Sequence, residues 1–440
     1  MSKFRVAGLV ASASLLLALF VVLPGMGADE KAAEKNDALY RPLGLFTEVF
    51  GLVKSNYVEP VETKPLLAGA FSGMTEALDP FSEYVPPEKM AAFTVWEASK
   101  DTRDVVDVGL VLARRFGYPV VVAAVDGSPA AAAGVKSDDV VEKLDGQLTR
   151  NMALWELDSK LSGKAGGRVR LEVVREGKPR HRTIDIVRAT WSPAAPSAQR
   201  VEGETVVRIP SFTPGAAAAI RKILEPLDKT HALVLDVRNN ATGTYEEAAR
   251  AAALFVAAGP LGELKGRRIE TKTYRAEAGD RVHESRLVVL VDSGTAGPAE
   301  LFASALREAT VRAPASTPKV VRDEQPKDTQ VKKEDEDAFD ADPGLESVKG
   351  ADKLPVRLVG ETTVGMAFTA QVVKLSSGGS LKLSVGKVHT LAGKALCPKG
   401  LQPDDRVFHG PPDEGTGKGD LILKRGLKIL GESARLKAAA

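Results

Sequence analysis

Residues 286–309 read RLVVLVDSGTAGPAELFASALREA, and this stretch decides the class of fold. Its first part, Arg286–Asp292, has an unbroken apolar centre, which predicts a strand buried on both faces of a sheet. The part from Pro298 through Ala309 predicts a helix, whose one side carries Leu301, Phe302, Ala305, Leu306 and Ala309. A buried strand that passes through a turn into such a helix indicates an α/β core.

The same texture continues on the N-terminal side of that stretch. Strands are predicted at Val206–Ile209 and Ala232–Val237, and helices at Ala216–Leu227 and Tyr245–Ala257. These elements alternate along the chain, as expected for helices that cover a sheet of mostly parallel strands. The α/β region therefore begins near Val206.

A charged segment interrupts the pattern on the C-terminal side. Between Arg312 and Pro355 the chain is rich in Lys, Asp, Glu and Pro, and residues 319–342 hold five basic and nine acidic side chains. Such a segment buries too little apolar surface to offset the entropy lost on ordering. We expect a disordered insertion here, with a partner-binding tail as the alternative. Strands are predicted again at Val356–Val359 and Leu381–Val385.

The region from Val105 to about Arg188 has a different texture, with short β-type runs at 109–113, 120–125, 140–144 and 169–175. Among them lies the short helix signal Ser128-Pro129-Ala130, a glycine stop at Gly134 and the turn Asp145-Gly146. This order resembles a PDZ domain. The resemblance implies that a polypeptide C-terminus adds as a strand, with its carboxylate on backbone N–H groups of the loop 107–110. It implies a peptide-binding set of Val108, Gly109, Leu110, Val111 and Leu112; a small β-barrel without a ligand is the alternative.

The first 28 residues have the layout of an export signal. Lys3 and Arg5 precede an apolar run from Val6 to Leu23, and small residues cluster near Ala28. We expect cleavage there, with an uncleaved membrane anchor as the alternative. Residues from about Leu39 to Phe93 then read as short helices, and one face predicted to be buried carries Leu43, Phe46, Val49, Phe50, Val53 and Tyr57.

Composition excludes several kinds of site. The chain has 440 residues with 60 basic and 58 acidic side chains, a net charge of +2, which argues against nucleic-acid binding by bulk positive charge. The single cysteine, Cys397, cannot close an internal disulfide or form a CxxC site. The five histidines are scattered, so no metal site and no cofactor are expected.

Several motifs, in this order and spacing, resemble the carboxyl-terminal processing (tail-specific) proteases, which are Ser–Lys peptidases with an embedded PDZ domain. The motifs are Tyr57-Val58-Glu59, Gly69–Met74, Leu78-Asp79-Pro80, the PDZ signature, Leu235–Asn240, Gly294-Thr295-Ala296 with Glu300, Gly360–Gly365, Leu381–Val385 and Lys399–Asp404. The resemblance implies an α+β multidomain fold. Its parts are an N-terminal helical segment (36–103), a β-barrel-like PDZ domain (104–188), an α/β crotonase-like or Clp-protease-like core (189–312 and 355–411) around the insertion (313–354), and a C-terminal helix or tail (412–440).

The catalytic positions implied by the resemblance carry the wrong side chains. The nucleophile position is Gly297 and the base position is Met366, neither of which can do acyl-transfer chemistry. The first oxyanion donor would follow the nucleophile, where Pro298 has no N–H. The second falls in the loop 240–243, where Thr242 replaces a glycine and resists a positive φ. Gln371 lies one step beyond the expected glutamine and is at most a remnant.

Three hypotheses follow for function. The first is an exported, non-catalytic relative that binds polypeptide C-terminal tails through its PDZ groove, as an adaptor or regulator in the periplasm or cell envelope. The second is an active peptidase with a displaced nucleophile among Ser293, Thr295 and Ser304, served by Lys374 or Lys382. The third is a structural subunit that pairs with an active paralogue or another envelope protein. Membrane contact is expected only through an uncleaved N-terminal segment.

Overall fold

A computed structural model describes residues 30–99, 106–150, 152–175, 181–309, 356–407 and 419–438. The expected export signal and the charged insertion lie outside the described residues. The chain divides into two compact units, Met1–Ala70 and Phe71–Ala440. Among the described helices, none is both long enough and apolar enough to span a membrane.

The first unit contains helix α2 (Glu30–Asn56) and the start of α3 (Thr63–Glu76). The prediction that one face of this helical segment is buried is wrong for most of its residues. Leu43, Phe46, Val49 and Tyr57 are exposed, and only Phe50 and Val53 are partly covered. The periodicity of α2 reports an amphipathic helix, but it carries no information about what covers the apolar side.

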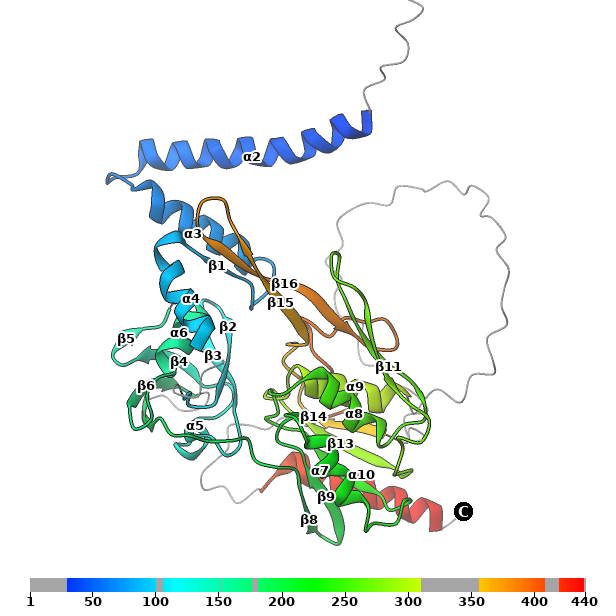
Figure 1. Cartoon of the computed structure of the whole chain (residues 1–440). Coiled ribbons are helices and arrows are strands. Elements are labelled where there is room, and N and C mark those ends of the chain that lie inside the picture. Colours follow the sequence, from blue (N-terminus) through cyan, green and yellow to red (C-terminus); the bar gives the residue numbers. More distant parts are fainter. Residues whose placement is uncertain are drawn as a thin grey trace, which may run out of the picture. The chain divides into compact units, whose positions relative to one another are not determined.

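The second unit begins with strand β1 (Glu83–Val85), a short 3-10 turn (Pro87–Lys89) and helix α4 (Met90–Ser99). A six-stranded antiparallel sheet follows, in the order β2-β3-β4-β6-β7 with β5 beside β4. Its elements are β2 (Leu110–Arg115), β3 (Tyr118–Ala124), α5 (Pro129–Ala132), β4 (Val140–Leu144), β5 (Gln147–Leu148), α6 (Leu154–Leu161), β6 (Arg168–Val174) and β7 (Arg182–Val187). Strand β2 lies at one edge of this sheet (Figure 1).

A second six-stranded sheet, in the order β17-β14-β13-β10-β9-β8, forms the α/β core. Its strands are β8 (Ser197–Val201), β9 (Glu204–Arg208), β10 (Leu233–Asp236), β13 (Leu287–Val291), β14 (Val356–Gly360) and β17 (Asp405–Arg406). All pairs are parallel except β8 with β9. The predicted α/β architecture is confirmed.

Helices cover both faces of this sheet, as the apolar runs of its strands require. Leu287 and Val289 of β13 pack in one cluster with residues of α7 (Ala216–Leu224), α8 (Tyr245–Ala253) and α9 (Pro298–Ala309). Val288 and Leu290 of the same strand pack instead against α10 (Leu421–Ala438). The alternation of side chains along β13 therefore divides the core into two layers.

A third, five-stranded sheet has the order β1-β16-β11-β12, with β15 paired to β16. Its remaining strands are β11 (Gly259–Lys265), β12 (Lys272–Ala276), β15 (Phe368–Lys374) and β16 (Ser380–His389). Strand β15 begins two residues after Met366, so this sheet holds one end of the segment that contains the predicted base position.

Candidate functional site

In the turn between β13 and α9, Gly297 lies directly before the helix. Gly297 has φ +57°, and Pro298 is the first residue of α9, where a missing N–H costs the helix nothing. The hydroxyl of Thr295 lies 3.0 Å from the carbonyl oxygen of Val237 and 3.0 Å from Oδ1 of Asp292. These contacts fix the turn, so the Thr295 hydroxyl serves the backbone.

The carboxylate of Glu300 ties this turn to the segment that contains Met366. Its Oε2 accepts the N–H of Gly297 at 2.9 Å and the N–H of Met366 at 2.8 Å. Its Oε1 accepts the N–H of Gly365 at 2.7 Å and the hydroxyl of Thr363. Glu300 is fully buried, and burial raises its pKa to about 7 in spite of these four donors.

The loop 240–243 joins the same assembly through the backbone. The N–H of Ala296 donates to the carbonyl oxygen of Asn240 at 2.9 Å, and the N–H of Val364 donates to that of Thr295 at 3.1 Å. Three separate stretches of chain thus meet at one point, and all four positions that the resemblance assigns to catalysis lie in or beside them. The three stretches meet in space, with Gly297 at the implied nucleophile position and Met366 at the implied base position.

The loop 240–243 differs in one respect from the expectation. Gly243, at φ +119°, carries the left-handed conformation, and Thr242 does not. A Cβ on Gly243 would lie 2.1 Å from the carbonyl carbon of Phe212, so only glycine fits there. Because the positive φ falls on Gly243, the expected strain at Thr242 is wrong. Instead its hydroxyl oxygen is buried without a hydrogen-bond partner among the described residues.

The alternative nucleophiles are occupied in other roles. The Ser293 hydroxyl donates to Asp138, and the Ser304 hydroxyl donates to the carbonyl oxygen of Leu301 in its own helix at 3.0 Å. Lys374 is exposed on β15, and Lys382 forms an ion pair with Glu83 at 3.8 Å. Gln371 is exposed on β15, and its side chain makes none of the hydrogen bonds found among the described residues. The structure brings none of these lysines to a candidate hydroxyl by any contact among those residues.

The predicted peptide-binding residues lie at the start of β2. Val108 and Gly109 are buried, and Leu110, Val111 and Leu112 are partly exposed along the edge strand. A hollow of about 200 Å³ adjoins them, lined on its other sides by Phe81, Trp96, Leu154, Trp155, Asp158, Met366, Phe368 and Lys382. The edge of the predicted groove and the predicted base position therefore share one hollow.

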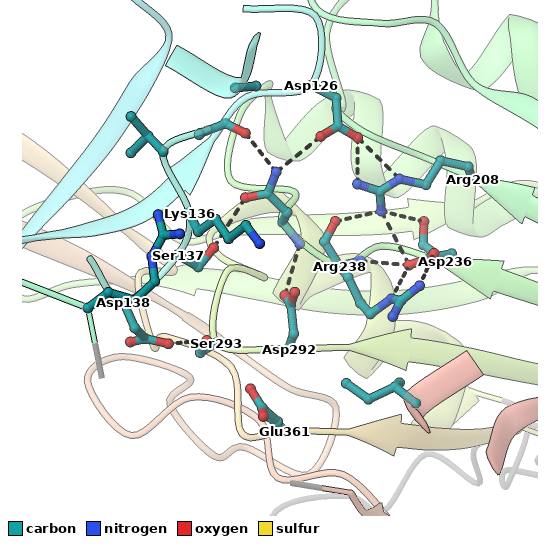
Figure 2. Close-up of a pocket in the computed structure, with 16 residues that line it drawn as sticks. Asp126, Lys136, Ser137, Asp138, Arg208, Asp236, Arg238, Asp292, Ser293 and Glu361 are labelled. Carbon is teal, nitrogen blue, oxygen red and sulfur yellow. Dashed lines mark hydrogen bonds and ion pairs between the residues drawn. The ribbon is translucent and has the colours of Figure 1, made fainter. Parts of the chain in front are cut away.

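A larger cavity of about 540 Å³ lies at the carboxyl ends of β9, β10, β13 and β14, beside the loop that follows β3 (Figure 2). Arg208 binds Asp126 at 2.6 Å and Asp236 at 3.2 Å, and Arg238 binds Asp236 at 2.7 Å. Burial raises the pKa of Asp292 at its floor. Most of the charged side chains that line this cavity form ion pairs or hydrogen bonds. We interpret this network as the contact between the antiparallel sheet and the α/β core.

The key residue of that contact is Asn239, which the sequence analysis quoted only as part of a motif. Its side-chain amide donates to the carbonyl oxygen of Ala124 at 2.7 Å and to Asp126 at 3.1 Å. Its side-chain oxygen accepts the hydroxyl of Ser137 at 3.2 Å. An available signal was the Asp236–Asn240 stretch directly after a buried strand, because such loops carry polar contacts at one edge of a parallel sheet. Among the described residues, no cluster of His, Cys, Asp or Glu is arranged to hold a metal ion.

Comparison with known proteins gives three regions of similarity. Residues 205–313 match peptidase family S41, residues 120–175 match the PDZ domain, and residues 25–89 match the activating protease CtpB N-terminal domain. The S41 match contains the turn with Gly297, and the PDZ match extends from within β3 to the end of β6.

Relatives and solved structures extend over more of the chain. A carboxy-terminal-processing protease of Bartonella bacilliformis is 26% identical over 94% of this chain and 84% of its own length. The carboxy-terminal processing protease CtpA of Bacillus subtilis is 25% identical over 90% of this chain and 74% of its own. The structure of a photosystem II D1 C-terminal processing protease has a TM-score of 0.58 at 23% identity, covering 82% of this chain and 86% of that one, which shows a shared fold.

Proposed function

We propose that this relative of the carboxy-terminal processing proteases, with its peptidase S41 and PDZ regions, binds polypeptide C-terminal tails without cutting them. The observation that carries the proposal is the state of the site around Glu300. The three stretches are assembled by buried hydrogen bonds, yet Gly297 and Met366 supply neither a nucleophile nor a base. A fold that keeps the geometry and lacks the reactive groups suits binding rather than turnover.

The edge of β2 supports tail binding. In the described part of the chain, its outer side is paired with no strand, so its backbone N–H and C=O groups are available to an added strand. The adjoining hollow is mostly apolar, with Leu110, Trp155 and Phe368 among its walls. An extended tail with apolar side chains would satisfy both features.

The cellular role follows from the sequence and stays part of this proposal. Residues 1–28 support export, and the intact groove beside an emptied site supports a role as adaptor or regulator in the cell envelope. Pairing with an active paralogue would use the same groove and fold. Co-purification from the native cell distinguishes the two roles. Recovery of an active paralogue would indicate pairing, and recovery of another envelope protein would indicate an adaptor or regulator.

Two measurements test the proposal. The purified chain should release no new N-termini from a denatured protein substrate, and Ser293→Ala and Thr295→Ala should leave that result unchanged. Hydrolysis that disappears in either variant would establish a displaced nucleophile instead. In a titration, an apolar peptide with a free C-terminal carboxylate should bind more tightly than its amidated form. Equal or absent binding of both forms would reject tail recognition.

A further inference from the structure

The loop in front of β2 is built around Gly109. Its φ is +75°, a conformation that favours glycine. A Cβ at this position would lie 2.1 Å from Cβ of Ser128 and 2.9 Å from a ring carbon of Trp191. Ser128 and Trp191 thus enclose Gly109, and the direction of its N–H is set by the backbone on both sides.

That N–H already has a carboxylate partner within the chain. The N–H of Gly109 donates to Oδ1 of Asp107 at 2.7 Å. The indole N–H of Trp191 donates to the same oxygen at 2.9 Å. Asp107 therefore does more than turn the local backbone, because a residue 84 positions further along the chain holds its carboxylate against the loop.

We propose that Asp107 competes with the carboxylate of a bound tail for the N–H of Gly109. The inference rests on the proposed tail binding and concerns how the groove selects its ligand. The N–H group that the loop would offer to a tail carboxylate is engaged, and a second carboxylate beside Asp107 would also meet charge repulsion. A bound tail must displace the Asp107 side chain and its bond to Trp191.

Because Asp107 occupies the N–H of Gly109, the terminal carboxylate of a tail contributes less to the binding affinity. The backbone groups along the outer edge of β2 are unaffected by Asp107, so they still bind the extended part of a tail. Free-acid and amidated tails should therefore differ in affinity by less than they would with an unoccupied loop. Asp107 acts as a specificity-determining residue for tails with a free carboxylate.

The test uses the full exported chain, an apolar eight-residue peptide that ends in valine, and the amidated form of that peptide. Asp107→Ala removes the competing carboxylate and should raise the affinity for the free acid by about tenfold, with the amide unchanged within about twofold. Asp107→Asn keeps an acceptor without the charge and should give about a threefold gain. Trp191→Phe keeps a ring against Gly109, frees Asp107 and should also favour the free acid.

The outcomes separate the two ideas. If wild-type protein prefers the free acid and Asp107→Ala does not increase that preference, competition by Asp107 is wrong while tail binding stands. If neither the wild type nor Asp107→Ala distinguishes the free acid from the amide, competition by Asp107 and the proposed tail recognition are both wrong. A preference that appears only in Asp107→Ala supports competition by Asp107 and rejects recognition of the chain end by the wild type. Unfolding curves of each variant establish that a loss of binding is not a loss of fold.

Discussion

Gly297 and Met366 donate their backbone N–H groups to one and the same oxygen atom, Oε2 of Glu300, at 2.9 and 2.8 Å. The two residues are 69 positions apart in sequence. They occupy the positions that the family resemblance assigns to the nucleophile and the base. The hydrogen bonds use only backbone atoms of these residues. These two hydrogen bonds of the site are therefore independent of the side chains at positions 297 and 366.

The first prediction concerns the pH dependence that Glu300 gives to stability. Its pKa is about 7 in the folded chain, above the ordinary value of 4.5, because burial opposes the charge. The raised pKa contributes stability below pH 4.5, and this contribution is lost as the pH rises through about 7. The free energy of unfolding of the wild type should therefore fall by up to ~3 kcal/mol from this group between pH 4.5 and 8.

The variant Glu300→Gln should remove this part of the pH dependence. It should also be less stable at low pH, since an amide matches four donors poorly. Urea unfolding at several pH values measures both effects. Glu277→Gln, at an exposed loop position, is the matched control and should leave the wild-type profile unchanged. An unchanged slope in Glu300→Gln would show that the carboxylate does not titrate in this range.

The second prediction concerns reactivation. A Cβ on Gly297 would lie 3.6 Å from the carbonyl oxygen of Met366, so a serine fits there, although the positive φ strains it. The double variant Gly297→Ser with Met366→Lys should nevertheless produce no new N-termini from a denatured substrate. Pro298 supplies no N–H, and loss of one oxyanion donor typically costs ~10²–10³-fold in rate.

A matched variant makes this prediction specific. Adding Pro298→Ala to the double variant restores an N–H after the serine. Activity should appear in this triple variant and not in the double variant. Peptidase activity in the double variant would show that the oxyanion donors matter less than we infer.

The sequence predicts the buried elements of the core well. Helix α9 lies at Pro298–Ala309 and strand β4 at Val140–Leu144, both between the expected residues. Proline at the first turn marks the start of α9, and the apolar run identifies β4. The strands without a sequence-based prediction are β1, β5, β7, β8, β11, β12, β15 and β17. Most residues of β8 are exposed, so its sequence SAQRV carries no apolar pattern.

The site was harder to predict than the fold. The motifs place Gly297, Pro298 and Met366 in stretches that the structure brings together, but most donors in the hydrogen bonds that join those stretches are backbone N–H groups. Sequence carries no record of where a backbone N–H points, so the three N–H groups that donate to Glu300 could not be predicted. The hydrogen bond between Trp191 and Asp107 could not be predicted either, because it joins residues far apart in the chain.

The third prediction concerns the ion pair between Arg175 and Asp139. Arg175 donates to both carboxylate oxygens of Asp139, at 2.6 and 2.7 Å, and both side chains are buried. Arg175→Met should lower the free energy of unfolding by ~3–5 kcal/mol, because it leaves a buried carboxylate uncompensated. The double variant Arg175→Met with Asp139→Asn should recover part of that loss in urea unfolding. A double variant no more stable than the single one would contradict this account.

The last prediction concerns Asn239, which binds Ala124, Asp126 and Ser137 from a backbone φ of +52°. Asn239→Gly keeps the backbone conformation and removes these bonds, so it should cost ~2 kcal/mol in unfolding free energy. Asn239→Ala removes the same bonds and adds ~1 kcal/mol of backbone strain. Both variants should speed amide exchange in the turn 293–297, because Ala296 packs on Val122 and Ala123 of β3. Stability loss without faster exchange would mean that Asn239 supports its own loop and does not hold the PDZ sheet against the core.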